Sequence, residues 1–294
     1  MKLFSRLGLF LICLAAVSSA ADKPKTREEA QALVSSLHFQ SGEVALGSGL
    51  ATLHVPPGFQ FLSGPDANKV IVDLWNNPPS HEPLGLLMTD GGPLSRDSWG
   101  VIITYDEDGY VKDADASEIN YDDLLKDMKK SVQEANPTRA KQGYPTMELV
   151  GWAAPPRYDQ ATHKLYWAKE LNFSDEGENT LNYNIRILGR RGVLVLNAVA
   201  SMSQMPAIEK SAADIIAAID FNPGNRYADF NPASGDKVAT YGLAALVAGG
   251  VAAKLGLFKG IWVALLAAKK FIIVAAVAVA GWFKRMFGKK ETAT

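Results

Sequence analysis

The chain has almost no cysteine: Cys13 is the only one among 294 residues. It lies in an N-terminal apolar stretch that we expect to be removed, so the mature chain would have none. The folded domain must then be held together by core packing rather than by disulfides. Thiol catalysis and cysteine-ligated metals are excluded for the same reason. Lipidation of Cys13 is not expected, because Ile12 stands where a small residue is needed.

An excess of positive charge is also missing. Lysine and arginine number 30 against 31 acidic residues, which gives a net charge of −1. A nucleic-acid-binding protein would carry a basic face, so we expect no nucleic-acid partner. Charged residues make up 21% of the chain and hydrophobic residues 48%, as in a globular protein with an added hydrophobic segment.

Motifs for catalysis and metal binding are absent as well. The sequence contains no GxSxG, Walker or GxGxxG motif. Its four histidines are far apart and form no zinc-binding pair: His38, His54, His81 and His163. The acidic run 106–109 and the residues after it fail the calcium-loop pattern, since a loop starting at Asp113 has Glu118 where glycine is needed. We therefore expect a solvated turn there, no metal, no cofactor and no recognisable catalytic residue.

Residues 1–21 have the pattern of a secretory signal peptide. Lys2 and Arg6 precede an apolar region over 7–17, and residues 18–21 are small, as signal peptidase requires. An uncleaved anchor stays open as an alternative, although the apolar region is about half of the ~20 residues that a membrane span needs.

The longest hydrophobic stretch covers residues 239–283. Because one span needs about 20 residues, we expect two membrane helices, about 240–258 and 261–283, followed by a basic tail, 284–294. The signal peptide would place the main domain on the extracytoplasmic (periplasmic) side of the cell membrane. Two crossings would return the tail to that side, whereas its basic residues favour the cytoplasm, so the number of crossings stays open.

Between these segments we expect an N-terminal helix (22–37), an α+β domain (38–225) and a linker (226–238). Helices are also expected over 66–76, over 121–135 with an end at Asn136-Pro137, and from Pro206 onward. Strand patterns follow one another with short turns, over 44–55, 84–88, 99–105, 147–153, 163–173, 181–188 and 193–200. This order predicts an antiparallel sheet flanked by helices.

The candidate binding site is a polar face of this sheet. Its residues come from two neighbouring strands: Lys169, Glu170, Asn182, Asn184 and Arg186, with Trp152, Tyr166 and Trp167 nearby. Strand alternation puts Asn182, Asn184 and Arg186 on one side. Such a face can bind a ligand or partner; a plain solvated face, or one covered by a helix, stays open as the alternative.

Several runs of residues resemble a bacterial family called domain of unknown function 2167. They include HKLYWAKELNF (163–173), TLNYNIRILGRRGVLVLNAVA (180–200) and the segment from Phe221 to Lys254. The resemblance implies an uncharacterised membrane-anchored bacterial protein, with a signal peptide, a C-terminal hydrophobic segment and no established catalytic residue. A weaker similarity, in VPPGF (55–59) and IDFN (219–222), is to PsbP/Mog1-like domains, which mostly bind partners.

Three functions are compatible with these patterns. The first is a membrane-anchored binding or assembly module with an unknown ligand or protein partner. The second is an enzyme with a non-standard site on the polar sheet face; a pocket that joins Arg186, Asn184 and a carboxylate would favour it. The third is a small oligomer of the membrane helices, packed through the small residues from Ala244 to Gly250.

Overall fold

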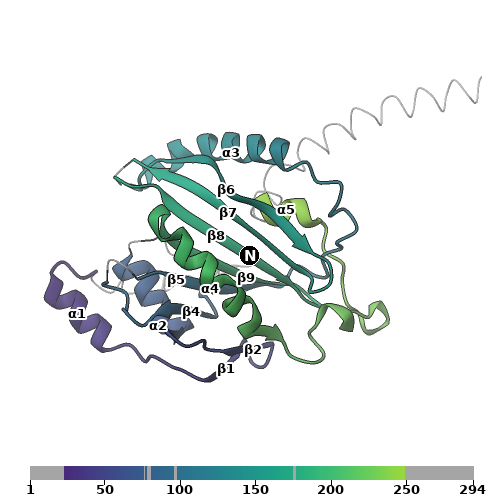
Figure 1. Cartoon of the computed structure of the whole chain (residues 1–294), viewed down its shortest axis with the longest axis horizontal. Coiled ribbons are helices and arrows are strands. Elements are labelled where there is room, and N and C mark those ends of the chain that lie inside the picture. The colour runs from purple at the N-terminus through teal and green to yellow at the C-terminus, as the bar shows by residue number, and fades with distance from the viewer. Residues whose placement is uncertain (1–22, 76, 78–80, 96–97, 175–176, 249–294) are drawn as a thin grey trace, which may run out of the picture.

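The computed structural model describes residues 23–75, 77, 81–95, 98–174 and 177–248 (Figure 1). The predicted signal peptide, most of the predicted membrane helices (249–283) and the basic tail lie outside the described residues. Within the described part of the chain, no helix has the length and apolar character needed to cross a membrane.

In the described part of the chain, ten strands form two antiparallel sheets. The larger has the order β3-β4-β5-β9-β8-β7-β6, and the smaller has the order β1-β2-β10. The strands of the larger sheet are β3 (Phe59–Ser63), β4 (Gly85–Thr89), β5 (Gly100–Asp106), β6 (Met147–Asp159), β7 (Lys164–Phe173), β8 (Thr180–Leu188) and β9 (Val193–Ser201). Those of the smaller sheet are β1 (Glu43–Leu46), β2 (Ala51–His54) and β10 (Ile219–Phe221).

Helices connect and cover these strands. The α-helices are α1 (Arg27–Ser35), α2 (Gly64–Asn68), α3 (Tyr121–Lys141), α4 (Met205–Ala218) and α5 (Leu243–Ala248). A π-helix, η1 (Lys69–Leu74), continues α2, and three short 3-10 helices are η2 (Met202–Gln204), η3 (Tyr227–Asp229) and η4 (Pro232–Ser234). The predicted α+β fold, with an antiparallel sheet flanked by helices, is confirmed.

The first core lies between one face of the large sheet, α4 and the small sheet. Successive residues of a strand point to opposite faces, and every second residue of β8 and β9 points into this core. It contains Leu181, Tyr183, Ile185 and Ile187 of β8, Leu194 and Leu196 of β9, Ile208 and Ile215 of α4, and Leu53 and Phe221 of the small sheet. Figure 1 shows α4 lying across β8 and β9.

The second core lies on the other face, beneath α3 and the C-terminal segment. It contains Leu165 and Trp167 of β7, Val193 and Val195 of β9, Met128 of α3, and Leu243, Leu246 and Val247 of α5. A third core adjoins it under α1 and α2, with Leu37, Leu62, Ala67, Val70, Leu86 and Met88. The large sheet is therefore covered on both faces.

Side chains cap the starts of two helices, α1 and α3. Thr26 Oγ1 accepts from the backbone N–H of Glu29 at 3.1 Å, and the Glu29 carboxylate accepts from the Thr26 N–H at 3.3 Å. Asn120 Oδ1 likewise accepts from the N–H groups of Asp122 and Asp123. These bonds satisfy N–H groups that have no partner within the first helical turn.

Helix α3 is longer than predicted. It runs through Pro137 to Lys141, although Asn136-Pro137 was expected to end it. Proline in a helix interior removes one backbone hydrogen bond, and here tertiary bonds oppose that loss. Asn136 donates to the Met147 carbonyl and accepts from the Met147 N–H, both at 2.9 Å, and Arg139 Nε donates to the Pro145 carbonyl at 2.9 Å. The start of β6 thus holds the end of the helix.

The chain beyond residue 225 differs from the expected linker. Tyr227 is buried, and the Tyr110 N–H donates to the Lys237 carbonyl while the Ala239 N–H donates to the Tyr110 carbonyl. Leu243, Leu246 and Val247 are buried in the second core. Residues 226–248 therefore pack on the domain, and part of the first predicted membrane helix, 240–248, belongs to this packed segment.

Candidate functional site

Four of the five predicted site residues share one face of the sheet. The register of β7 and β8 sets Lys169 opposite Asn182, Trp167 opposite Asn184 and Leu165 opposite Arg186. Directly paired residues of antiparallel strands point to the same side. Because Leu165 and Trp167 belong to the second core, this polar face is covered by α3 and the C-terminal segment rather than solvated.

Glu170 lies on the opposite face. It is paired with Leu181, which belongs to the first core, and its Oε1 accepts from Asn179 Nδ2 at 2.6 Å. The sequence grouped Glu170 with Lys169 because they are adjacent, but adjacent strand residues point apart. The face therefore keeps its two cations and loses the carboxylate that the prediction included.

Arg186 is a buried cation, with 7% of its surface exposed. Its Nη1 donates to Asn197 Oδ1 at 3.2 Å and to the Ile185 carbonyl at 3.0 Å, and its guanidinium carbon lies 4.9 Å from the centre of the Trp167 ring. Burial lowers the pKa of Arg186 to about 10, so it stays charged at neutral pH. Among the described residues, no carboxylate forms an ion pair with it.

Lys169 is the second cation of this face. Burial, with a smaller contribution from the charge of Arg186, lowers its pKa to about 8. Within the described residues, neither a hydrogen bond nor an ion pair engages its Nζ atom. The two cations repel each other, which adds to the lowering of the Lys169 pKa, whereas the charge of Asp106 favours the charged form of Arg186.

Two tryptophans add donors that lack an acceptor. Trp152 is paired directly with Lys169 across β6 and β7. The indole N–H groups of Trp152 and Trp167 are buried, and neither has a hydrogen-bond partner in the described structure. An unpaired buried donor costs about 1–3 kcal/mol. We call Trp152, Trp167, Lys169 and Arg186 the donor cluster; what it lacks is an acceptor.

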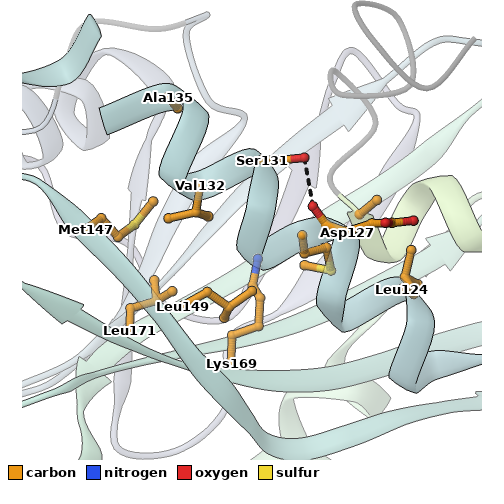
Figure 2. Close-up of a pocket in the computed structure, with 11 residues that line it drawn as sticks. Leu124, Asp127, Ser131, Val132, Ala135, Met147, Leu149, Lys169 and Leu171 are labelled. Atoms are coloured by element: carbon orange, nitrogen blue, oxygen red, sulfur yellow. Dashed lines mark hydrogen bonds between the residues drawn. The ribbon is translucent and has the colours of Figure 1, made fainter. Parts of the chain in front are cut away.

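A groove lies beside Lys169, which is the member of this cluster that lines it (Figure 2). It has a volume of about 220 Å³ and lies between α3 and the strands β6 and β7. Its lining consists of Leu124, Asp127, Met128, Ser131, Val132, Ala135, Met147, Leu149, Lys169, Leu171 and Ala248. Figure 2 shows the Lys169 nitrogen among apolar side chains of α3 and β6. The groove thus combines a mostly apolar wall with one ammonium, from Lys169, and one carboxylate, from Asp127.

The groove does not form a nucleophile–base pair. Ser131 Oγ donates to the backbone carbonyl of Asp127 at 2.9 Å, one turn earlier in α3. A catalytic serine would instead be hydrogen-bonded to its base, here the Lys169 amine.

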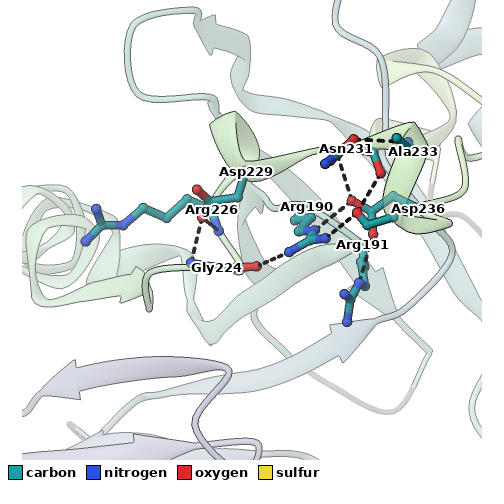
Figure 3. A network of polar contacts seen from close by, with 9 residues as sticks. Arg190, Arg191, Gly224, Arg226, Asp229, Asn231, Ala233 and Asp236 are labelled. Carbon is teal, nitrogen blue, oxygen red and sulfur yellow. Dashed lines mark hydrogen bonds and ion pairs between the residues drawn. The ribbon is translucent and has the colours of Figure 1, made fainter.

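A second polar network fastens the C-terminal segment (Figure 3). The carboxylate of Asp236 accepts from Arg190 Nε at 2.6 Å, from Arg191 Nε at 3.1 Å and from the Asn231 N–H at 2.8 Å. The hydrogen bond from Arg190 is the main cause that lowers the pKa of Asp236 to about 2. This network ties the turn at Arg190 and Arg191 to the segment around Asp236.

A third cluster was missed from the sequence. Tyr158 Oη donates to Asp113 at 2.6 Å, and His163 Nδ1 lies 3.2 Å from Tyr158 Oη and 3.5 Å from Asp113. The His163 ring packs on Tyr227 at 4.0 Å. Burial raises the pKa of Asp113, but hydrogen bonds from Tyr158 and Tyr227 bring it below its ordinary value. These residues are far apart in the chain, with Tyr158 in β6, Tyr227 in η3 and Asp113 and His163 outside the strands and helices, and no local pattern marks them.

The acidic turn at 106–109 also holds the C-terminal segment. Asp108 accepts from Tyr241 Oη at 2.9 Å, and the Gly109 N–H donates to the Arg191 carbonyl. A side chain at Gly109 would come within 2.7 Å of the Lys237 carbonyl oxygen, and its φ of +104° favours glycine. No group of three or more possible metal ligands occurs in the described ranges.

The fold and site define an antiparallel α+β domain with a covered, donor-rich sheet face. The profile of the family described as "Protein of unknown function (DUF2167)" matches residues 38–280, and the chain belongs to this family. The resemblance read from the sequence is thereby confirmed. A comparison with curated proteins found no match.

Solved structures that resemble the chain are distant in sequence. Cyanobacterial PsbP (CyanoP) from Synechocystis is 11% identical; the match covers 63% of this chain and 92% of that one, with a TM-score of 0.35. LpqN, involved in cell envelope biogenesis of Mycobacterium tuberculosis, is 15% identical over 69% and 100%, with a TM-score of 0.31. The Ran-binding protein Mog1p of Saccharomyces cerevisiae is 12% identical over 67% and 100%, with a TM-score of 0.32.

Proposed function

We propose that this chain is a membrane-anchored binding module on the extracytoplasmic side, and that its donor cluster receives an acidic group of the ligand. The observation that carries the proposal is the composition of the cluster. Two cations and two unpaired indole N–H groups face a single covered surface, with no carboxylate paired to either cation among the described residues. A ligand carboxylate would supply the acceptor that these groups lack.

The location of the domain rests on sequence. The signal-peptide pattern over 1–21 and the hydrophobic stretch over 239–283 favour export and anchoring. Because residues 226–248 pack on the domain, an anchor would begin after Ala248. The domain would then sit close to the membrane surface.

Short, water-soluble anions test the cluster without involving the apolar groove. The full chain, in one non-ionic detergent, is titrated with acetate while tryptophan fluorescence is recorded, since Trp152 and Trp167 belong to the cluster. We expect a saturable change with acetate and none with acetamide, its uncharged analogue. Lys169→Met should abolish the change.

The control is Lys210→Met, which removes an exposed lysine from α4 on the other side of the sheet. It should respond to acetate like the unmodified chain. A response of equal size in Lys169→Met, or with acetamide, would contradict an anion site at the donor cluster.

A further inference from the structure

The chemistry of the groove narrows the class of ligand. Six apolar side chains from three elements form most of its wall: Leu124, Met128, Val132, Met147, Leu149 and Leu171. Two of these are methionines, whose flexible side chains adapt to an alkyl chain. A sugar or nucleotide would need many paired polar groups, and this wall offers few. An unbranched hydrocarbon chain fits it best.

The cationic side chain that lines the groove indicates the head group of the ligand. Lys169 is the lining residue with a cationic group, and its amine has no partner in the described structure. Arg186 donates to Asn197 through Nη1, lies over the Trp167 ring and is not part of the groove lining, so it contributes positive potential rather than a direct contact. One free ammonium matches one carboxylate; a phosphate monoester would call for a second free donor pair.

The position of the groove indicates where such a ligand comes from. Ala248, at the end of α5, lines the groove. The chain continues from there into the stretch whose sequence predicts a membrane anchor. An anchored domain would thus hold its groove next to the bilayer, which is a source of long-chain carboxylic acids.

We propose that the groove binds a long-chain fatty acid drawn from the membrane, with its carboxylate on Lys169 and its alkyl chain between α3 and β6. This rests on the proposed binding function and adds the ligand class to it. A volume of about 220 Å³ holds part of such a chain. The remainder would extend from the groove toward the bilayer.

Photoaffinity labelling of the full chain tests this ligand class. The chain is placed in phosphatidylcholine nanodiscs and exposed to palmitic acid that carries a diazirine on its alkyl chain. The matched probe is the same molecule with an alcohol in place of the acid. Cross-linked peptides are mapped by mass spectrometry. We expect the acid to label residues 121–141 and 147–149 about tenfold more than the alcohol, because a charged hydrogen bond is lost with the alcohol.

Matched variants locate the site. Ala135→Trp fills the groove from an exposed position of α3, and Gln133→Trp places the same side chain on α3 outside the lining. Ala135→Trp should reduce acid labelling about tenfold, Gln133→Trp should leave it unchanged, and Lys169→Met should make acid and alcohol label equally. Circular dichroism checks that each variant is folded.

Two results would overturn the fatty-acid site: equal labelling by acid and alcohol in the unmodified chain, or labels outside the groove that Ala135→Trp leaves unchanged. Either result, with the acetate response intact, would remove the fatty-acid ligand and leave the anion-binding function standing. Loss of the acetate response as well would remove both.

Discussion

Burial of Lys169 costs folding free energy, because its charged form loses water and gains no partner. The folded pKa of about 8 is below the ordinary 10.5. Between these values the unfolded chain binds the proton more tightly, so stability should rise as pH increases through this window. A residue kept at such a cost is typical of a site that serves a ligand.

The contrast between Lys169 and Glu170 shows what a sequence can predict about single residues. Strand alternation correctly joins Asn182, Asn184 and Arg186, which lie on one face with Lys169. It could not tell whether that face meets solvent or a helix, because α3 and the segment around Tyr241 come from elsewhere in the chain. The pairing of Asp113 with His163 was hidden for the same reason.

The contribution of a single buried carboxylate to stability can be tested at Asp66. Its carboxylate, 8% exposed, accepts from the His38 N–H at 2.9 Å and from Lys69 Nζ at 2.7 Å. Burial alone would raise its pKa, but these hydrogen bonds lower it to about 2. Asp66→Asn should reduce the free energy of unfolding at pH 7 by about 1–3 kcal/mol, measured by urea denaturation.

The pH dependence of this effect follows from the lowered pKa. The contribution of Asp66 is fully present above the unfolded pKa, near 3.8, and is lost as pH falls toward the folded value of about 2. The stability difference between Asp66→Asn and the unmodified chain should shrink over that range. A difference that stays constant from pH 7 to pH 2 would mean that the carboxylate charge has no stabilising role.

At the scale of elements, the strands were predicted more closely than the segments that follow Asn136 and Asn225. The alternation of side chains between the two faces of the sheet in β7 and β8 depends on the local sequence alone. The continuation of α3 through Pro137 depends instead on bonds from Asn136 to Met147 in β6. The turn-rich composition after Asn225 indicated a linker, yet Arg190 and Arg191 of the β8–β9 turn bind Asp236.

Helix α5 offers a test of that packed segment. Leu246 is 2% exposed in the second core. Leu246→Ala should lower the free energy of unfolding of the domain by about 2–5 kcal/mol, because it leaves a cavity in the core. Chemical denaturation of the full chain, followed by the near-ultraviolet circular dichroism of the tryptophans, measures the loss.

Thr240→Ala is the matched control, since Thr240 is exposed in the same segment. It should change stability by less than about 0.5 kcal/mol. If Leu246→Ala were equally silent, residues 243–248 would not belong to the domain core, and the segment would behave as the linker that its composition suggests.

At the scale of the whole molecule, the family and the fold class could be predicted together. The runs around β7, β8 and the C-terminal segment marked the family that the profile confirms over residues 38–280. The antiparallel order of strands followed from their short connections. The groove could not be predicted, because it forms where α3, β6, β7 and α5 meet.

The central claim is that Lys169 is kept for an acidic ligand at the expense of stability. It is tested on the stability of the whole protein. Replacement of a half-buried, unpaired ammonium by methionine should raise the free energy of unfolding at pH 7 by about 1–3 kcal/mol. The same variant should lose the stabilisation that a bound ligand gives to the folded state. A ligand-binding residue and a purely structural one differ in both respects: in how their replacement changes stability without ligand, and in whether it removes the stabilisation by ligand.

The most direct measurement is the thermal midpoint of unfolding of the full chain and of Lys169→Met, each with and without dodecanoate. We predict that Lys169→Met has the higher midpoint without dodecanoate, and that dodecanoate raises the midpoint of the unmodified chain alone. A lower midpoint for Lys169→Met without ligand, together with equal shifts in both proteins, would contradict the account.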